Sequence, residues 1–570
     1  MMRSGVLPPV PRLLARILLL AGLGLAPWAG ATEAAGRPGH AAIASAHHLA
    51  TDAGFEVLAK GGNAFDAAVA VSAALAVVEN SSSGIGGGGF WLLHRASDGK
   101  RVFIDGRETA PAAVRSSDYL DANGQLDRDR SINGALAAGI PGEPAALVLI
   151  AEQYGRVPLA VSLAPAIRLA RDGFPLEQRL AGMIAMRREV LQRYPASRKV
   201  YLHKGEVPKL GSKIRQPDLA ATLQALADRG FDGFYRGRVA SALVKGVRAA
   251  GGNWSLDDLS HYRAIEREPL SFRYRGSEIV SAPPPSSGGV ILATIFNIIE
   301  GYDFPALDRV GRVHLLVEAM RRAYRDRSFI LGDPDQVAMP IDLLTSKAYA
   351  AGLRAAIRMD KATPSAALPE GPAVVGGTDT THFSIIDADG NLVAGTASVN
   401  LPMGSGLIVP GTGVLLNNEM DDFALAPNQA NAYGLIGTDA NAPQPGKRML
   451  STMTPTLVFR DDRVLVIGTP GGSRIATMVA LGLAGFFDGA DAESIVAAPR
   501  FHHQYLPDVI SFEAGALADA ELARLQKLGH KVEVAPRTWG NMNLVIWDRV
   551  QNRLHAASDP RGLVGKGMVR

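Results

Sequence analysis

The stretch that decides the fold is Gly376-Gly377-Thr378-Asp379-Thr380-Thr381-His382-Phe383-Ser384-Ile385-Ile386-Asp387. It sets threonines directly before a segment whose residues favour a β-strand. If the peptide bond before Thr380 is cut, the new α-amine lies beside the hydroxyl of the same residue, which is then both nucleophile and base. An α-amine titrates at about pH 8, so part of it is neutral at physiological pH and can accept that proton. The plain alternative is that threonine simply favours strands.

The chain after Thr380 has the pattern of a strand-rich region. Two predicted strands, His382 to Asp387 and Asn391 to Val399, flank a turn at Ala388-Asp389-Gly390 and form a hairpin. Further strands are expected at Thr456 to Arg460, Val464 to Ile467, Val509 to Phe512, Lys531 to Val534 and Asn543 to Trp547, with helices at Ser473 to Phe487 and Asp519 to Leu528.

The chain before the threonines is mostly helical in pattern. Residues 361–375 are rich in Pro and Ala without periodicity and are interpreted as a mobile linker, so the change in composition coincides with the threonine cluster. Helices are expected at Ala41 to Lys60, Ala64 to Val78, Gly142 to Tyr154, Leu159 to Asp172, Leu176 to Arg193, Pro217 to Arg229, Arg238 to Ala250 and Val310 to Arg327.

The composition is that of a globular protein. Of the 570 residues, 47% are hydrophobic and 20% are charged, which argues against extensive disorder. There is no cysteine, so disulfides, thiolate metal sites and a cysteine nucleophile are excluded. The sequence has no basic stripe with interleaved aromatic residues, so nucleic-acid binding is not supported.

The first residues have the pattern of a cleavable export signal. Arg3, Arg12 and Arg16 precede the apolar run 17–25 and the small residues Ala29-Gly30-Ala31. The apolar run is shorter than the roughly 20 residues of a spanning helix, so cleavage after Ala31 is favoured over a membrane anchor. Removing residues 1–31 takes away three arginines and no acids and lowers the net charge from +4 to +1. We expect a periplasmic or secreted protein without a membrane span after cleavage.

Two glycine-rich segments carry different predictions. Gly468-Thr469-Pro470-Gly471-Gly472-Ser473-Arg474 lies between a predicted strand and a predicted helix, where backbone N–H groups form a natural anion or oxyanion site. It lacks the Gly-Lys-Ser/Thr of a phosphate loop. Gly84-x-Gly86-x-x-Gly89 matches a dinucleotide fingerprint only formally, because a helix precedes it and an apolar strand follows. We interpret it as a buried turn.

Charged residues gather at two further places. Arg107 follows a predicted strand at residues 101–104 and could fork onto a carboxylate, although a surface ion pair with Glu108 or Asp105 is the common outcome. Asn417-Asn418-Glu419-Met420-Asp421-Asp422-Phe423 holds three carboxylates and two amides. A solvated turn, a calcium loop or a pocket for a substrate ammonium group are all open, although the EF-hand spacing is missing.

Taken together, these segments resemble γ-glutamyltransferases, the γ-glutamyltranspeptidases of the N-terminal nucleophile hydrolase superfamily. The resemblance covers nearly the whole chain after the leader. The matching stretches are Asn80 to Phe90, Asp105 to Pro111, Pro284 to Gly289, Thr380 to Ser384, Leu416 to Phe423, Lys447 to Pro455, Gly468 to Arg474, Pro499 to Gln504 and Ser558 to Arg561.

The resemblance implies an α+β fold, a four-layer αββα sandwich built from two subunits that a precursor makes by cutting itself. Carried onto this chain, the cut falls between Asp379 and Thr380. After a signal peptide at residues 1–31, the large subunit would be residues 32–379 and the small subunit residues 380–570. Thr378 and Thr381 are neighbouring candidates, and the resemblance selects Thr380 as the nucleophile.

The resemblance also implies a role for each site residue. The substrate α-carboxylate would be held by Arg107, Ser451 and Thr452, and the α-ammonium by Asn400, Glu419 and Asp422. Gly471 and Gly472 would form the oxyanion hole, Ser398 would tune the nucleophile, and Tyr433 would belong to a lid loop at residues 427–447, which also fits a plain surface loop.

The implied activity is cleavage of glutathione and related γ-glutamyl amides, with transfer to water or to amino acid or peptide acceptors and without cofactor or metal. Two alternatives remain: an acylase that acts on glutaryl or cephalosporin side chains, and a catalytically silent periplasmic amino-acid-binding relative. The acidic residues at the implied ammonium site favour a glutamyl over a glutaryl substrate.

Overall fold

The computed structural model describes residues 36–368, 380–426, 429, 431–435 and 437–570. The predicted leader and Asp379 lie outside the described residues. Within the described part of the chain, no helix is both long and apolar enough to cross a membrane.

Two β-sheets form the centre of the unit Pro38–Arg570. The first has seven strands in the order β18-β1-β9-β10-β2-β3-β6. Its strands are β1 (Ala42–Ser45), β2 (Gly88–His94), β3 (Arg101–Gly106), β6 (Ile265–Arg267), β9 (Thr381–Ile386), β10 (Leu392–Ser398) and β18 (Lys566–Val569).

The second sheet has six strands in the order β17-β16-β12-β11-β8-β7. Its strands are β7 (Leu270–Tyr274), β8 (Ser277–Ser281), β11 (Thr456–Phe459), β12 (Arg463–Gly468), β16 (Asn543–Asp548) and β17 (Arg553–Ser558). Smaller sheets contain β13 (Phe501–His502), β14 (Ile510–Phe512) and β15 (Val532–Val534), and β4 (Phe174–Pro175) with β5 (Lys213–Ile214).

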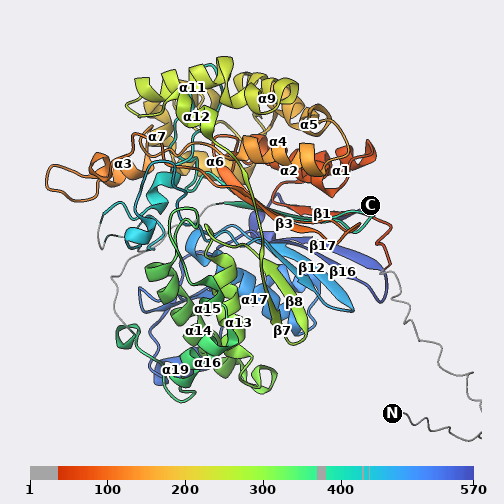
Figure 1. The fold of residues 1–570 in the computed structure, drawn as a ribbon, viewed down its shortest axis with the longest axis vertical. Coiled ribbons are helices and arrows are strands. Elements are labelled where there is room, and N and C mark those ends of the chain that lie inside the picture. Colours follow the sequence, from red (N-terminus) through yellow and green to blue (C-terminus); the bar gives the residue numbers. More distant parts are fainter. Residues whose placement is uncertain (1–35, 369–379, 427–428, 430, 436) are drawn as a thin grey trace, which may run out of the picture. The chain divides into compact units, whose positions relative to one another are not determined.

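Helices cover both outer faces, so the layers run helix, sheet, sheet, helix (Figure 1). On the seven-stranded side lie α1 (His48–Ala59), α2 (Ala64–Val78), α4 (Glu143–Tyr154), α5 (Leu159–Asp172), α9 (Pro217–Arg229), α10 (Phe231–Tyr235), α11 (Gly237–Ala249) and α12 (Leu256–His261). On the six-stranded side lie α13 (Gly288–Ile299), α14 (Arg309–Ile330), α15 (Ile341–Leu344), α16 (Lys347–Ala355), α17 (Ile475–Phe487), α18 (Ala492–Ala497) and α19 (Asp519–Lys527).

Shorter helical segments connect these layers. They are α3 (Arg128–Ile132), α6 (Gln178–Met186), α7 (Arg188–Arg193), α8 (Pro195–Tyr201) and the 3-10 turns η1 (Ser116–Tyr119), η2 (Phe304–Ala306), η3 (Ser365–Ala367), η4 (Glu419–Asp422), η5 (Asp439–Asn441), η6 (Gly472–Arg474) and η7 (Pro560–Gly562). The predicted α+β class is thereby confirmed.

The predicted hairpin after Thr380 forms β9 and β10, which pair from Thr381↔Ala397 to Ile386↔Leu392. The glycine segment before Gly89 is the predicted buried turn, with α2 before it and β2 after it. Both strands of the hairpin lie inside the seven-stranded sheet, with β1 against β9 and β2 against β10. Segments on either side of residue 379 therefore share one sheet.

One helix prediction is wrong at its start. Ala41 to Lys60 was predicted as a single helix, but Ala42–Ser45 is strand β1 and the helix begins at His48. In β1, Ala42 and Ala44 pack into the core between the sheets, while Ile43 packs into the core under the helices. Burial between two neighbouring strands outweighs the helix propensity of alanine. The predicted helix Leu176 to Arg193 is also divided, into α6 and α7.

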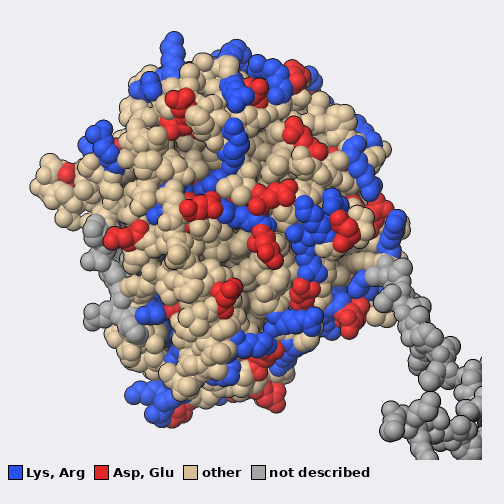
Figure 2. Space-filling model, viewed as in Figure 1, with Lys and Arg blue, Asp and Glu red and all other residues tan. Residues whose placement is uncertain are grey.

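Surface charge follows no single pattern. On the face shown in Figure 2, Lys and Arg side chains are interspersed with Asp and Glu side chains rather than gathered in one basic stripe.

Candidate active site

Thr380 lies directly before β9 and is 3% exposed. The strand behind it is held by polar side chains as well as by its ladder. The Thr381 hydroxyl donates to Glu79 at 2.5 Å, and the His382 ring contacts the Thr396 hydroxyl at 2.8 Å. Complete burial lowers the pKa of His382 to about 3, so this ring is neutral at pH 7.

The end of β10 brings Ser398 and Asn400 to the same region. The Asn400 backbone N–H donates to Ser398 Oγ at 2.8 Å, and the Asn400 side-chain amide donates to the Asn418 carbonyl at 2.8 Å. Asn400 adopts φ 76°, a left-handed conformation that asparagine tolerates better than most residues. Its Oδ1 is buried and has no hydrogen-bond donor within the described residues.

Glu419 and Asp421 of the acidic turn are buried, so the alternative of a solvated turn is wrong. Glu419 is 1% exposed and lies in η4, next to Asp422. Asn417 explains the burial, because its amide donates to the carbonyls of Gly86 at 2.7 Å and Gly139 at 2.8 Å. These bonds pull the turn against the glycine segment that precedes β2, a contact that local sequence does not encode.

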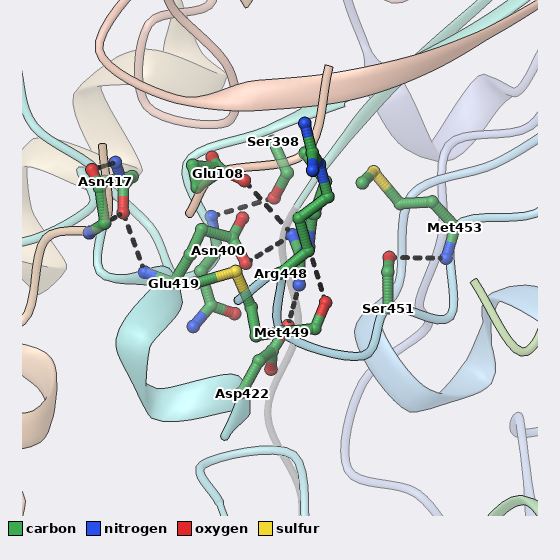
Figure 3. A network of polar contacts seen from close by, with 12 residues as sticks. Glu108, Ser398, Asn400, Asn417, Glu419, Asp422, Arg448, Met449, Ser451 and Met453 are labelled. Carbon is green, nitrogen blue, oxygen red and sulfur yellow. Dashed lines mark hydrogen bonds and ion pairs between the residues drawn. The ribbon is translucent and has the colours of Figure 1, made fainter. Parts of the chain in front are cut away.

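Arg107 follows β3 and joins a polar network with this turn, of which Figure 3 labels Glu419, Asp422 and Met449. Its guanidinium donates to Glu419 at 2.6 Å, to Asp422 at 2.5 Å and to the Met449 carbonyl at 3.1 Å. Glu108 lies farther away, at 3.5 Å. Arg107 is 1% exposed, so the common outcome of a surface ion pair does not apply here.

The network holds more acids than cations. Burial raises the pKa of Glu419 well above its usual range, and Arg107 opposes this shift. Burial likewise raises the pKa of Glu108 to about 8, again against Arg107. One Glu419 oxygen and one Glu108 oxygen have no donor within the described residues. Together with Asn400 Oδ1, they form a buried cluster of acceptors without donors in the described residues, which suits a cationic ligand.

Ser451 and Thr452 lie two and three residues after Met449, whose carbonyl accepts from the Arg107 guanidinium. The Ser451 segment is fixed by the large N-terminal part of the chain, since the Ser287 N–H and hydroxyl donate to the Ser451 carbonyl at 2.8 and 2.9 Å. Ser451 and Thr452 are 3% and 7% exposed.

The second glycine segment forms the predicted turn between β12 and α17, with η6 inserted before the helix. Gly471 has φ 147° and Gly472 has φ 55°, both positive values that favour glycine. A Cβ built on Gly471 would lie 2.3 Å from Met478 Cε. The turn is also held from below, because the buried Tyr324 hydroxyl of α14 donates to the Ser473 carbonyl.

Tyr433 is buried rather than part of an open surface loop. Its hydroxyl donates to the Asn400 carbonyl at 2.5 Å, and its carbonyl accepts from Gln504 at 3.4 Å. Asn431 donates to Asp422 at 2.9 Å. These described residues of the 427–447 segment therefore contact the polar network directly.

A model of the family described as "Gamma-glutamyltranspeptidase" matches residues 50–567, which include the whole network around Arg107 and Thr380. The chain belongs to the γ-glutamyltranspeptidase family. Among curated relatives, the glutathione hydrolase proenzyme of Pseudomonas sp. (strain A14) is 42% identical, over 92% of this chain and 93% of that protein. The proenzyme of Escherichia coli K12 is 40% identical, over 91% and 90%.

The solved structures similar to this γ-glutamyltranspeptidase-family chain include a cephalosporin acylase and a γ-glutamyltranspeptidase, and both activities were considered in the sequence analysis. The cephalosporin acylase of Bacillus halodurans superposes with a TM-score of 0.82 at 29% identity, covering 93% of this chain and 95% of that one. The γ-glutamyltranspeptidase of Helicobacter pylori gives a TM-score of 0.56 at 40% identity, covering 57% of this chain and 94% of that one.

Sequence reasoning did not identify three polar residues that support the site of this family member. Glu79 ends α2, Glu108 follows Arg107, and Tyr324 lies within a long helix. For Glu108, the signal was its place beside Arg107, which was read only as an ion-pair partner. For Glu79 and Tyr324 there was no signal, because their partners Thr381 and Ser473 are far away in the sequence.

Proposed function

We propose that this chain is an exported, self-processing γ-glutamyltransferase and glutathione hydrolase of the N-terminal nucleophile type. The observation that carries the proposal is the buried cluster in which Arg107 donates to Glu419 and Asp422, while Asn400 Oδ1 and a Glu419 oxygen have no donor in the described residues. A γ-glutamyl headgroup carries one carboxylate and one ammonium, and this cluster offers a guanidinium for the first and acceptors for the second.

In the proposed reaction, the Thr380 hydroxyl attacks the γ-carbonyl and passes its proton to the α-amine of the same residue. The N–H groups of Gly471 and Gly472 stabilise the negative charge on the carbonyl oxygen. The leaving amine takes the proton as the C–N bond breaks, and a γ-glutamyl ester remains on Thr380. Water or an acceptor amine then attacks this ester and restores the hydroxyl.

The free amine of Thr380 requires a prior cut between Asp379 and Thr380. We assign this cut to the same hydroxyl, which attacks the Asp379 carbonyl. The Asp379–Thr380 C–N bond breaks, its nitrogen takes the hydroxyl proton and becomes the α-amine, and water then hydrolyses the resulting ester to an Asp379 carboxylate and the restored hydroxyl. The products are a large subunit of residues 32–379 and a small subunit of residues 380–570, with residues 1–31 removed on export.

The acylase alternative keeps the nucleophile but changes the headgroup. A glutaryl group has no ammonium, so it leaves Asn400 Oδ1 and the free Glu419 oxygen without a partner in a buried site, which is unfavourable. These two acceptors therefore support the glutamyl substrate over the glutaryl one, even though a cephalosporin acylase is among the structural neighbours.

The deciding experiment compares purified wild type and Thr380→Ala on a denaturing gel. We expect two bands for the wild type, one uncut band for Thr380→Ala, and no turnover of glutathione by the variant. Thr378→Ala is the matched control and is expected to process like the wild type. An uncut wild type, or a Thr380→Ala protein that still yields two bands, would falsify the proposed function.

A further inference from the structure

The first two residues of β9 are paired on one side only. On the β10 side the ladder reaches Thr381, which lies opposite Ala397. On the β1 side the ladder ends at Phe383, which lies opposite Ser45. Thr381 therefore extends past the end of its neighbour β1, at the point where the strand meets the nucleophile.

Glu79 contacts Thr381 at this end of the strand. It caps α2 at its C-terminal end, is 3% exposed, and accepts a 2.5 Å hydrogen bond from the Thr381 hydroxyl. Its other oxygen accepts from Arg179 Nε at 3.1 Å. Both carboxylate oxygens are thus satisfied, one by the strand and one by a cation.

The bond from Thr381 is of the strong, charge-assisted kind, because its acceptor is a carboxylate with an arginine partner. Burial raises the pKa of Glu79, and Arg179 and the Thr381 hydroxyl oppose that shift. Adjacent residues of an extended chain point to opposite faces. The hydrogen bond to the Thr381 side chain therefore does not obstruct the face to which the Thr380 side chain points.

The consequence becomes important when the chain is cut. In the precursor, Thr380 is covalently held from both sides, whereas after cleavage it is a chain terminus, and termini fray unless they are tied down. A nucleophile must be kept within about 3–3.5 Å of the carbonyl it attacks. After the cut, the covalent connection of Thr380 to the rest of the small subunit runs through Thr381.

On the basis of the proposed function, we propose that Glu79 and Thr381 are a positioning pair that orients Thr380, once it is the N-terminal residue, for attack. Neither residue touches the substrate in this role. Glu79 belongs to the proposed large subunit and Thr381 to the small one, so the pair also makes the geometry of the nucleophile depend on both subunits.

The test compares Thr381→Val with Thr381→Ser in the full-length, exported enzyme. Valine keeps the shape and removes the hydroxyl, whereas serine keeps the hydroxyl. For Thr381→Val we expect kcat on a γ-glutamyl anilide to fall about 10-fold or more with KM changed less than about 2-fold, since misplacement lowers attack and not binding. Thr381→Ser should stay within about 3-fold of the wild type.

Thr222→Val is the matched control, because the buried Thr222 hydroxyl also donates to an oxygen, the Thr412 carbonyl at 2.7 Å, but in the helical layer. Thr222→Val should lower the melting temperature by as much as Thr381→Val does, but it should not lower kcat. If Thr381→Val loses no more kcat than Thr222→Val, or if serine fails to restore kcat, the positioning role is wrong.

If Thr381→Val does not fold, Glu79→Gln decides, since it removes the negative charge and so weakens the charge-assisted bond that Thr381 donates. A kcat lowered at unchanged KM supports the pair, and wild-type kcat overturns it. An inactive or uncut wild type would instead contradict the proposed function, so the two failures are distinguishable.

Discussion

At the scale of single residues, the buried guanidinium of Arg107 is hydrogen-bonded to two acids, Glu419 and Asp422. Truncating one member of a buried, hydrogen-bonded charge pair costs about 2–5 kcal/mol. We therefore expect Arg107→Ala to lower kcat/KM for a γ-glutamyl anilide by roughly 30-fold or more, while the precursor still processes. Steady-state kinetics and a denaturing gel check the two halves of this prediction.

Arg312→Ala is the control for that loss. Arg312 pairs with Asp488 at 2.7 Å, and neither residue belongs to the network around Arg107. It should leave kcat/KM within about 3-fold of the wild type, in line with a partly exposed pair. Unchanged turnover by Arg107→Ala would refute the assignment of the substrate carboxylate.

Glu143, at the start of α4, gives a prediction of pH dependence. It is fully buried, neither oxygen has a hydrogen-bond partner in the described residues, and burial raises its pKa to about 8. The Gly84 backbone opposes this shift weakly, from outside hydrogen-bond geometry. Between the unfolded pKa of about 4.5 and the folded pKa of about 8, only the folded state keeps the proton, so stability falls as pH rises.

The neutral variant Glu143→Gln does not lose stability in this way as the pH rises. Its free energy of unfolding should rise relative to the parent by about 1 kcal/mol per pH unit from pH 5 to 8, and level off above that range. Denaturant unfolding at several pH values, in the Thr380→Ala background so that the chain is expected to stay in one piece, measures the difference. A difference that does not change with pH would show that Glu143 is not held protonated.

At the scale of elements, α14 supports the oxyanion turn through one hydroxyl. Tyr324 donates to the Ser473 carbonyl just after Gly471 and Gly472. Losing a net hydrogen bond of about 0.5–1.5 kcal/mol loosens this turn, so Tyr324→Phe should lower kcat by about 3- to 10-fold with little change in KM. Tyr349→Phe is the control, because the Tyr349 hydroxyl also donates to a residue of α14, Asp326, at 2.9 Å. Equal kinetics for both variants would remove this role from Tyr324.

At the scale of the whole molecule, the sheets should hold the processed subunits together. β9 and β10 lie between β1 and β2, and β8 pairs with β11, so each of the two large sheets contains hydrogen-bonded strands from both sides of residue 379. We expect the processed wild type to run as one species on size exclusion, with dissociation and loss of circular dichroism at the same urea concentration. Separation of the subunits at urea concentrations that leave the dichroism intact would contradict this prediction.

The sequence by itself determined the local pieces of this protein: the hairpin after Thr380, the glycine turn before α17, the helices with clear periodicity and the family to which these pieces belong. Each depends on neighbours within a few residues, where turn chemistry and hydrophobic spacing act. Tertiary structure alone decided that Ala42–Ser45 is a strand, that the acidic turn is buried and that Glu79 reaches Thr381. The reason is physical: burial and hydrogen bonding between segments hundreds of residues apart leave no periodic trace in either segment, yet their free energies exceed local propensity.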